Sequence, residues 1–253
     1  MMQSLYTAAT GISGQQTRID TIADNIANIN STGFKSSRTS FKDTIYSKME
    51  NPEETGQASN LQKGTGVSPA ATDKNFKQGN IEATGNKLDF AIDGSGFFSL
   101  LNSKGETVYT RNGSFSVSAE EDGNYLTSSD GSYVLDNNGL KIEIPDGTSG
   151  FTVAGDGSFV SGDGTTVKLG VFEFPNTEGL ASLGDSKFAA TAASGDAVQA
   201  EDFTVCQGEL EGSNVDLSVE LTQLIQAQRM YSFASQALQT ADEMEGLAIN
   251  IRS

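Results

Sequence analysis

The side chains that most often carry chemistry in proteins are scarce in this sequence. It contains no histidine and a single cysteine, Cys206. Ser-His-Asp and Cys-His catalysis are therefore impossible, and the commonest zinc ligand is missing. One thiol cannot form an intrachain disulfide, and in the β-like run 204–208 it is expected to be a small apolar filler. Chemistry by carboxylates alone remains possible, such as glycoside hydrolysis by two acids that face one cleft. No motif in the sequence supports it.

The glycine-containing stretches predict turns rather than ligand sites. Residues 94–99, GSGFFS, begin like G-x-G-x-x-G but lack the third glycine, and no apolar helix follows. They are expected to form a hairpin turn. None of the Asp-Gly pairs fits the spacing of a calcium-binding loop, so these pairs also predict turns. No cofactor, metal or small-molecule substrate is expected.

Composition excludes further classes of protein. The formal net charge is −17 and basic residues form no cluster, which argues against nucleic acid and anionic membranes as partners. No apolar run approaches the roughly 18 residues of a transmembrane helix. The first basic residue is Arg18, and no apolar stretch precedes a cleavage site, so no cleaved signal peptide is expected.

Both ends of the chain have the pattern of long helices. Residues 3–29 carry apolar side chains seven residues apart in two offset series, the pattern of a helix that needs a helical partner. A second helix is expected from Asp216 or Leu217 to about residue 251. The proposed N-terminal seam is Leu5, Ile12, Ile19, Ile22, Ile26 and Ile29. The proposed C-terminal seam is Leu221, Leu224, Ala227, Met230, Ala234, Ala237, Leu238, Ala241 and Met244.

Short alternating segments separated by Asp-Gly and Asn-Gly turns fill the region from 67 to about 210, which predicts antiparallel β structure. The fold class expected is α+β, with long terminal helices paired as a coiled coil and a central antiparallel all-β domain. The expected domains are 1–35 with 212–253, a connecting segment 36–80 with an extended loop at 51–66, and a β-rich outer domain at 81–211.

The two seams admit two interpretations. They could close one intramolecular helical hairpin, or they could form an assembly surface. The C-terminal helix has a second apolar face, more than one partner helix would cover, which favours packing between molecules.

Four blocks of sequence resemble the bacterial flagellar rod and hook axial proteins. Residues 23–35, ADNIANINSTGFK, are similar to that family's N-terminal signature, although Asp24 stands where asparagine is usual and Ser31 precedes the threonine. The blocks 89–98, 109–115 and 211–216 follow in the family's order. The matching residues are Asn25, Ala27, Asn28, Gly33, Phe34, Gly94, Gly96, Phe97, Arg111, Gly113, Ser213, Asn214 and Val215.

This resemblance implies a non-enzymatic structural subunit of the flagellar basal-body rod. Such a subunit polymerises with itself and with other rod and hook axial proteins, and the flagellar export apparatus secretes it without a cleaved signal. The segment before Val67 is most similar to the distal rod branch, with the proximal rod branch as the alternative. The resemblance also implies terminal helices that order as they pack. A secreted adhesin or other binding module with an all-β head is the alternative function.

Overall fold

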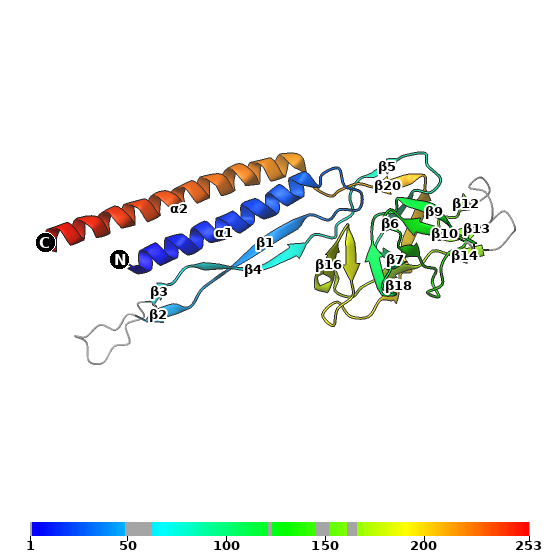
Figure 1. The fold of residues 1–253 in the computed structure, drawn as a ribbon, viewed down its shortest axis with the longest axis horizontal. Helices are drawn as coiled ribbons and strands as arrows, with labels where there is room; N and C mark the ends of the chain where they lie inside the picture. Colours follow the sequence, from blue (N-terminus) through cyan, green and yellow to red (C-terminus); the bar gives the residue numbers. More distant parts are fainter. Residues whose placement is uncertain (1, 49–61, 121–122, 145–151, 161–165, 253) are drawn as a thin grey trace. The chain divides into compact units, whose positions relative to one another are not determined.

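A computed structural model of the protein has the α+β architecture that the sequence predicts, with a helix at each end of the chain and antiparallel strands between them in sequence (Figure 1). The described residues are 2–48, 62–120, 123–144, 152–160 and 166–252. The chain divides into two compact units. The helical unit comprises Met1–Ala27, Ser37–Lys74 and Asp216–Ser253, and the β unit comprises Asn28–Ser36 and Asn75–Val215.

The two predicted helices form the frame of the helical unit. Helix α1 (Met2–Ala27) and helix α2 (Leu217–Arg252) lie side by side and run in opposite directions. The predicted start of α2 is confirmed, because Asp216 Oδ1 accepts hydrogen bonds from the backbone N–H groups of Ser218 (2.9 Å) and Val219 (3.2 Å). This is a helix N-cap, which satisfies N–H groups that lack a partner within the helix.

A two-stranded sheet completes the helical unit. Strand β1 (Ser37–Asp43) pairs with β4 (Val67–Lys74), and both contact α1. Gly14 of α1 is buried here, since a Cβ atom on it would lie 3.2 Å from the Phe41 ring. The small residue admits the sheet, which offsets the cost of about 1 kcal/mol for glycine within a helix. Strand β2 (Tyr46–Lys48) pairs with β3 (Gln62–Gly64), and most of the expected loop 51–66 lies outside the described residues.

The β unit contains the remaining strands, and all their pairings are antiparallel. Its largest sheet has the order β16-β17-β8-β7-β11-β10-β9, with β15 joining β7 to β18. Smaller sheets pair β12-β13-β14, β19-β6 and β20-β5. The strands are β5 (Ile81–Ala83), β6 (Phe90–Gly94), β7 (Phe97–Leu101), β8 (Thr107–Thr110), β9 (Phe115–Glu120), β10 (Gly123–Ser128), β11 (Tyr133–Val134), β12 (Thr152–Val153), β13 (Ser158–Val160), β14 (Thr166–Lys168), β15 (Val171–Glu173), β16 (Ala181–Gly184), β17 (Lys187–Ala189), β18 (Val198–Gln199), β19 (Phe203–Gln207) and β20 (Glu209–Glu211).

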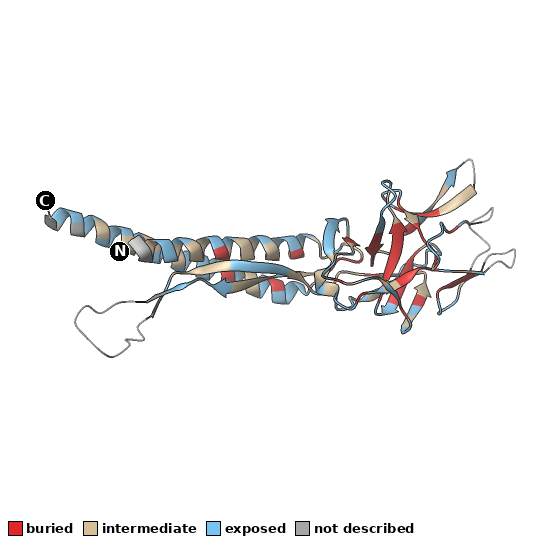
Figure 2. Ribbon diagram, turned by 90° about the horizontal axis from the view of Figure 1, so that it is seen from below, coloured by how far each residue is buried: buried red, intermediate tan, exposed pale blue. Residues whose placement is uncertain are grey.

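The alternation of strand β7 separates two apolar clusters in the β unit. Phe98 belongs to the main core, together with Leu100 and Ile92, all at most 1% exposed. Its neighbour Phe97 belongs to an aromatic cluster with Phe188 and other rings. Successive side chains of a strand point to opposite faces, so one strand serves both clusters. Figure 2 shows many buried residues on the strands of the β unit.

The turn predictions are confirmed in part. Hairpins form at 103–105 between β7 and β8 and at 130–131 between β10 and β11. The hairpin expected at 94–96 is wrong, because β6 pairs with β19 while β7 pairs with β8. Gly94 and Gly96 instead carry the chain from one sheet to another with φ angles of 113° and 129°. A Cβ atom on Gly96 would lie 2.6 Å from Val171 Cγ1, so glycine is required there for space as well as conformation.

Candidate functional site

Helix α1 has most of its apolar surface covered within the helical unit. Of the proposed N-terminal seam, Ile22 is buried, whereas Leu5, Ile12, Ile19 and Ile26 are half-buried. Ile29 lies beyond the end of α1, in a turn of the β unit. Tyr6 is the one large apolar side chain of α1 that is exposed among those described. Helix α2 and the β1–β4 sheet therefore already occupy the sides of α1 that need partners.

The proposed C-terminal seam separates into a covered and an uncovered set. Ala227 is buried, and Leu224, Ala234, Leu238 and Ala241 are half-buried. These positions follow one another in steps of three, four or seven residues, so they form one stripe along the helix. Leu221, Met230, Ala237 and Met244 are exposed and lie off this stripe.

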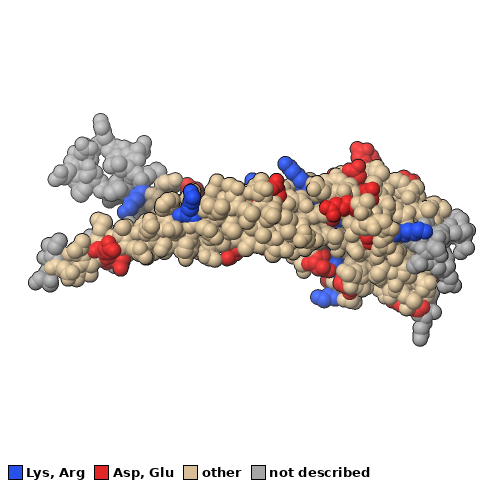
Figure 3. Space-filling view, turned by 90° about the horizontal axis from the view of Figure 1, so that it is seen from above, with Lys and Arg blue, Asp and Glu red and all other residues tan. Residues whose placement is uncertain are grey.

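Helix α2 also carries the largest group of exposed apolar side chains among the described residues. At 100° per residue these side chains lie on more than one side of the helix. They are Leu217, Val219, Leu221, Ile225, Met230, Tyr231, Phe233, Met244, Leu247 and Ile249, each at least 37% exposed. A helix that is apolar on several sides is ordinarily buried by neighbours, and a large exposed apolar surface marks an interaction site. On the face drawn in Figure 3, Lys and Arg side chains are scattered and form no patch.

Asn25 links three elements of the helical unit. Its side chain is 1% exposed, and its Oδ1 accepts a hydrogen bond from Ser37 N (2.8 Å). Its Nδ2 donates to Ser37 O (2.9 Å) and to Glu220 Oε1 (3.2 Å). Burial raises the pKa of Glu220, and the hydrogen bond from Asn25 opposes that shift. The signature asparagine thus joins the end of α1 to β1 and to the first turn of α2.

The last part of the signature, residues 28–35, belongs to the β unit. Gly33 has φ 64°, and its N–H donates to Glu211 O (2.8 Å). A Cβ atom on Gly33 would lie 2.5 Å from Asn112 N, and Thr32 Oγ1 donates to Asn112 Oδ1 (2.9 Å). Gly33 therefore has a left-handed conformation, and its lack of a side chain allows two backbone segments to come close together.

Lys35 of this segment belongs to a group of three buried charged residues. This group, Lys35, Arg111 and Glu211, is called the Glu211 cluster. Lys35 Nζ lies 2.6 Å from Glu211 Oε1, and Arg111 Nη1 lies 3.1 Å from Glu211 Oε2. The side chains are 1%, 5% and 0% exposed, respectively. Burial lowers the pKa of Lys35 and of Arg111, and the attraction of Glu211 opposes both shifts. Arg111 Nη2 also donates to Gly94 O (2.7 Å).

Asn214 of the C-terminal block supports the same segment. Its Oδ1 accepts from Ser36 N (2.8 Å), and its Nδ2 donates to Asn75 O (2.7 Å) and Lys77 O (2.9 Å). Next to it, Ser213 Oγ accepts from Val215 N (3.3 Å). The signature and the C-terminal block, far apart in sequence, therefore meet within the β unit.

The other matching residues have structural roles with one exception. Phe34 is buried, and the Arg111 guanidinium lies 5.5 Å from the centre of the Phe97 ring. A Cβ atom on Gly113 would lie 1.7 Å from Phe90 O. Asn28 Oδ1 accepts from Ser31 Oγ (3.2 Å). Ala27 is exposed, and nothing in the structure explains it.

Sequence reasoning missed Lys35, Glu211 and Glu220 as key residues. Lys35 ends the N-terminal signature and Glu211 begins the C-terminal block, so both were within quoted motifs. Their opposite charges were a usable signal, since buried charges require partners. The sequence alone did not indicate that they would be buried together.

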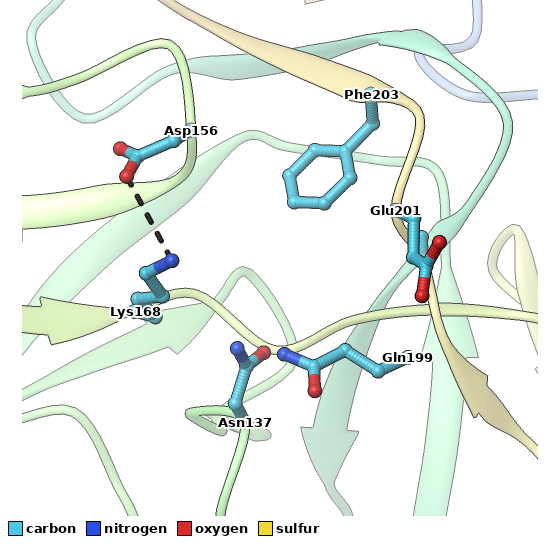
Figure 4. A pocket seen from close by; sticks show the side chains of 7 residues that line it. Asn137, Asp156, Lys168, Gln199, Glu201 and Phe203 are labelled. Atoms are coloured by element: carbon cyan, nitrogen blue, oxygen red, sulfur yellow. Dashed lines mark ion pairs between the residues drawn. The ribbon is translucent and has the colours of Figure 1, made fainter.

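A pocket of about 360 Å³ opens on the β unit (Figure 4). Its lining includes the exposed ion pair of Asp156 and Lys168, with 3.8 Å between Oδ2 and Nζ, as well as Glu201 and the apolar ring of Phe203. Hydrogen bonds from Ser158 lower the pKa of Asp156. A general acid needs the opposite shift, so this carboxylate is poorly suited to donate a proton at neutral pH.

Comparison with known families matches three separate segments that together cover more than half of the chain. Residues 5–35 match the model described as "Flagella basal body rod protein". Residues 91–161 match "Flagellar hook protein FlgE/F/G D1 domain", and residues 207–251 match "Flagellar basal body rod FlgEFG protein C-terminal". The first and last matches contain the signature and the C-terminal block that meet in the β unit.

Individual proteins are similar over their full length. The flagellar basal-body rod protein FlgG of Agrobacterium fabrum is 40% identical, covering 97% of this chain and 98% of the relative. FlgG of Borreliella burgdorferi is 36% identical over 100% of this chain and 99% of the relative. FlgG of Bacillus subtilis is 34% identical over 100% of both.

Proposed function

The chain belongs to the FlgG-type flagellar basal-body rod proteins, structural subunits of the bacterial flagellum, and we propose that it polymerises into the axial shaft that carries torque from motor to hook. The family is one of structural proteins and not an enzyme class. The proposal extends this to the chain itself, which acts through packing and without catalysis.

The observation that carries the proposal is the exposed apolar surface of α2. A single folded chain leaves residues such as Ile225 and Phe233 more than half exposed. Burying an exposed side chain of this size stabilises a contact by roughly 1.5–3 kcal/mol before the costs of association. Ten large apolar side chains of this helix are at least 37% exposed, and contact with neighbouring subunits would cover them.

We further propose that α1 and α2 pair as a coiled coil whose outer surface binds neighbouring copies. The half-buried stripe containing Leu224, Ala227, Ala234, Leu238 and Ala241 has the spacing of such a seam. Its alanines suit close approach of the two helices. Head-to-tail contacts that do not close into a ring generate an open helical polymer. The proposed partners are other copies, the remaining rod and hook axial proteins, and the export apparatus that delivers the chain.

The test is polymer formation by purified protein, observed by electron microscopy and sedimentation. Ile225→Glu places a charge on the exposed apolar surface and should prevent polymerisation, with a helical circular dichroism signal equal to that of unassembled wild type. The matched control is Gln226→Glu, which adds the same charge at the exposed neighbouring position and should polymerise normally. Straight polymers formed equally well by Ile225→Glu would refute the role of this surface.

A further inference from the structure

The β unit is assembled from two separate stretches of the chain. Asn28–Ser36 comes from the N-terminal side, and Asn75–Val215 follows only after the strands of the helical unit. The short stretch carries Lys35, and the last part of the long stretch carries Glu211. The contact between these two residues therefore joins the two stretches of chain that make up the β unit.

The Glu211 carboxylate is the point at which these stretches meet. Its Oε1 accepts hydrogen bonds from Lys35 Nζ (2.6 Å) and Gly79 N (2.8 Å), and its Oε2 accepts from Arg111 Nη1 (3.1 Å). The backbone repeats the connection, since Gly33 N donates to Glu211 O (2.8 Å). Glu211 thus contacts the segment 28–36 and two other parts of the β unit, at Gly79 and at Arg111.

The Glu211 cluster contains two cations and one carboxylate. Loss of the Glu211 charge should therefore cost more stability than loss of Lys35. One carboxylate lies between two cations that are almost fully buried. If Lys35 is removed, the pair of Glu211 and Arg111 remains neutral. If the charge of Glu211 is removed, two cations face each other without a carboxylate between them. Removing one member of a buried ion pair is strongly destabilising, and here two buried cations would lose the same carboxylate at once.

We propose that Glu211 acts as a clasp. The β unit folds stably only when the N-terminal segment 28–36 and the C-terminal block that carries Glu211 are both in place. Until Glu211 is in place, Lys35 and Arg111 repel each other in a buried position, so the segment 28–36 does not dock stably. The folded β unit then requires the N-terminal segment and the C-terminal block together. This property is independent of polymerisation and can be measured on the unassembled protein.

The experiment is a double-mutant cycle in the full-length chain with Glu211→Gln, Lys35→Met and both together. The glutamine keeps an oxygen to accept from Gly79 N, but its amide NH2 group replaces the oxygen that accepts from Arg111 Nη1. The single change therefore removes the negative charge and one of the two acceptors. Urea unfolding measures stability, and hydrogen exchange with mass spectrometry measures protection of peptides covering 28–36 and 75–83. Asp130→Asn is the matched control, because Asp130 pairs with Lys187 elsewhere in the β unit.

Glu211→Gln should raise the unfolding equilibrium constant on the order of 10²- to 10³-fold, and Lys35→Met should raise it less. The double variant should be at least as stable as Glu211→Gln, because it lacks the repulsion between Lys35 and Arg111. Peptides covering 28–36 should exchange faster in Glu211→Gln and keep wild-type rates in Asp130→Asn.

Two results would overturn the clasp. One is a cycle in which the costs of Glu211→Gln and Lys35→Met simply add, with protection of 28–36 unchanged. The other applies if Glu211→Gln does not fold. The double variant must then recover a folded β unit, and its failure to fold while Asp130→Asn folds would show that charge repulsion is not the cause.

Discussion

Replacing Asn25 by aspartate tests the polar link between α1, β1 and α2 most directly. The variant keeps the oxygen that accepts from Ser37 N, but it loses the amide that donates to Ser37 O (2.9 Å) and Glu220 Oε1 (3.2 Å). It also places two carboxylates in contact at a position that is 1% exposed in the native chain. Asn25→Ala removes the same donors without adding charge and is the matched comparison.

The expected cost follows from these contacts. Each lost hydrogen bond is worth about 1 kcal/mol, and an unsatisfied buried partner adds about 1–3 kcal/mol. Asn25→Ala should therefore lower the free energy of unfolding by about 2–4 kcal/mol. Asn25→Asp should cost more at pH 8, where both carboxyl groups tend to ionise. At pH 5 one of them holds a proton and can donate to the other, so we expect about 2 kcal/mol of this cost to be recovered.

The wild-type protein already has a pH dependence of the same sign. The folded-state pKa of Glu220 is raised above 4.5, so the folded state keeps a proton that the unfolded state has lost. Its contribution to stability is greatest below pH 4.5 and declines as the pH rises through the folded-state pKa. Asn25→Asp should make this decline steeper, whereas Asn25→Ala should not add a second titrating group.

Circular dichroism at 222 nm is a suitable assay, because both α-helices among the described residues belong to the helical unit. Urea unfolding is followed at pH 5 and pH 8 for wild type, Asn25→Ala and Asn25→Asp. Equal costs for the two variants at both pH values would refute the reasoning, because a buried contact with Glu220 demands a difference that depends on pH.

Two further predictions concern the β unit and assembly. Burial raises the pKa of Asp130, but hydrogen bonds from Lys187 and Ser132 outweigh it and bring the pKa to about 2, below its ordinary 3.8. The stabilisation is present above pH 3.8 and lost as pH falls through about 2, so the cost of Asp130→Asn, about 1 kcal/mol or less for a partly exposed pair, should vanish in acid urea titrations. A cost that persists undiminished below pH 2 would point to packing instead. Helix content measured by circular dichroism should rise on polymerisation, because the apolar sides of α2 gain neighbours; equal content in monomer and polymer would show that both helices are fully formed beforehand.

Local rules of sequence predicted much of this fold. Asp216 precedes an apolar periodic run, and it caps α2 where expected. Turns such as 103–105 need only residues that favour tight chain reversal, and those hairpins formed. Information of this kind lies within a few residues, so it survives without knowledge of the rest of the chain.

Pairings over long distances were beyond these rules. The stretch 94–96 has the composition of a hairpin turn, yet β6 pairs with β19, more than a hundred positions away. Gly96 is required by a neighbouring side chain, Val171, that only the folded sheet brings close. The same holds for Lys35 and Glu211, whose charges are evident in the sequence while their burial depends on tertiary packing.

The helix seams show what the sequence pattern determines and what only the folded structure determines. The predicted seam on α2 follows a repeat of three and four residues. That helix is apolar on several sides, and the repeat can be drawn through more than one of them. Ala227 lies in the covered stripe, whereas Met230 and Met244 are 54% and 62% exposed. The partner within the chain selects one stripe, and what it leaves uncovered defines the surface available to a neighbouring subunit. The choice between hairpin and assembly is therefore not exclusive, because one helix has enough apolar surface for both.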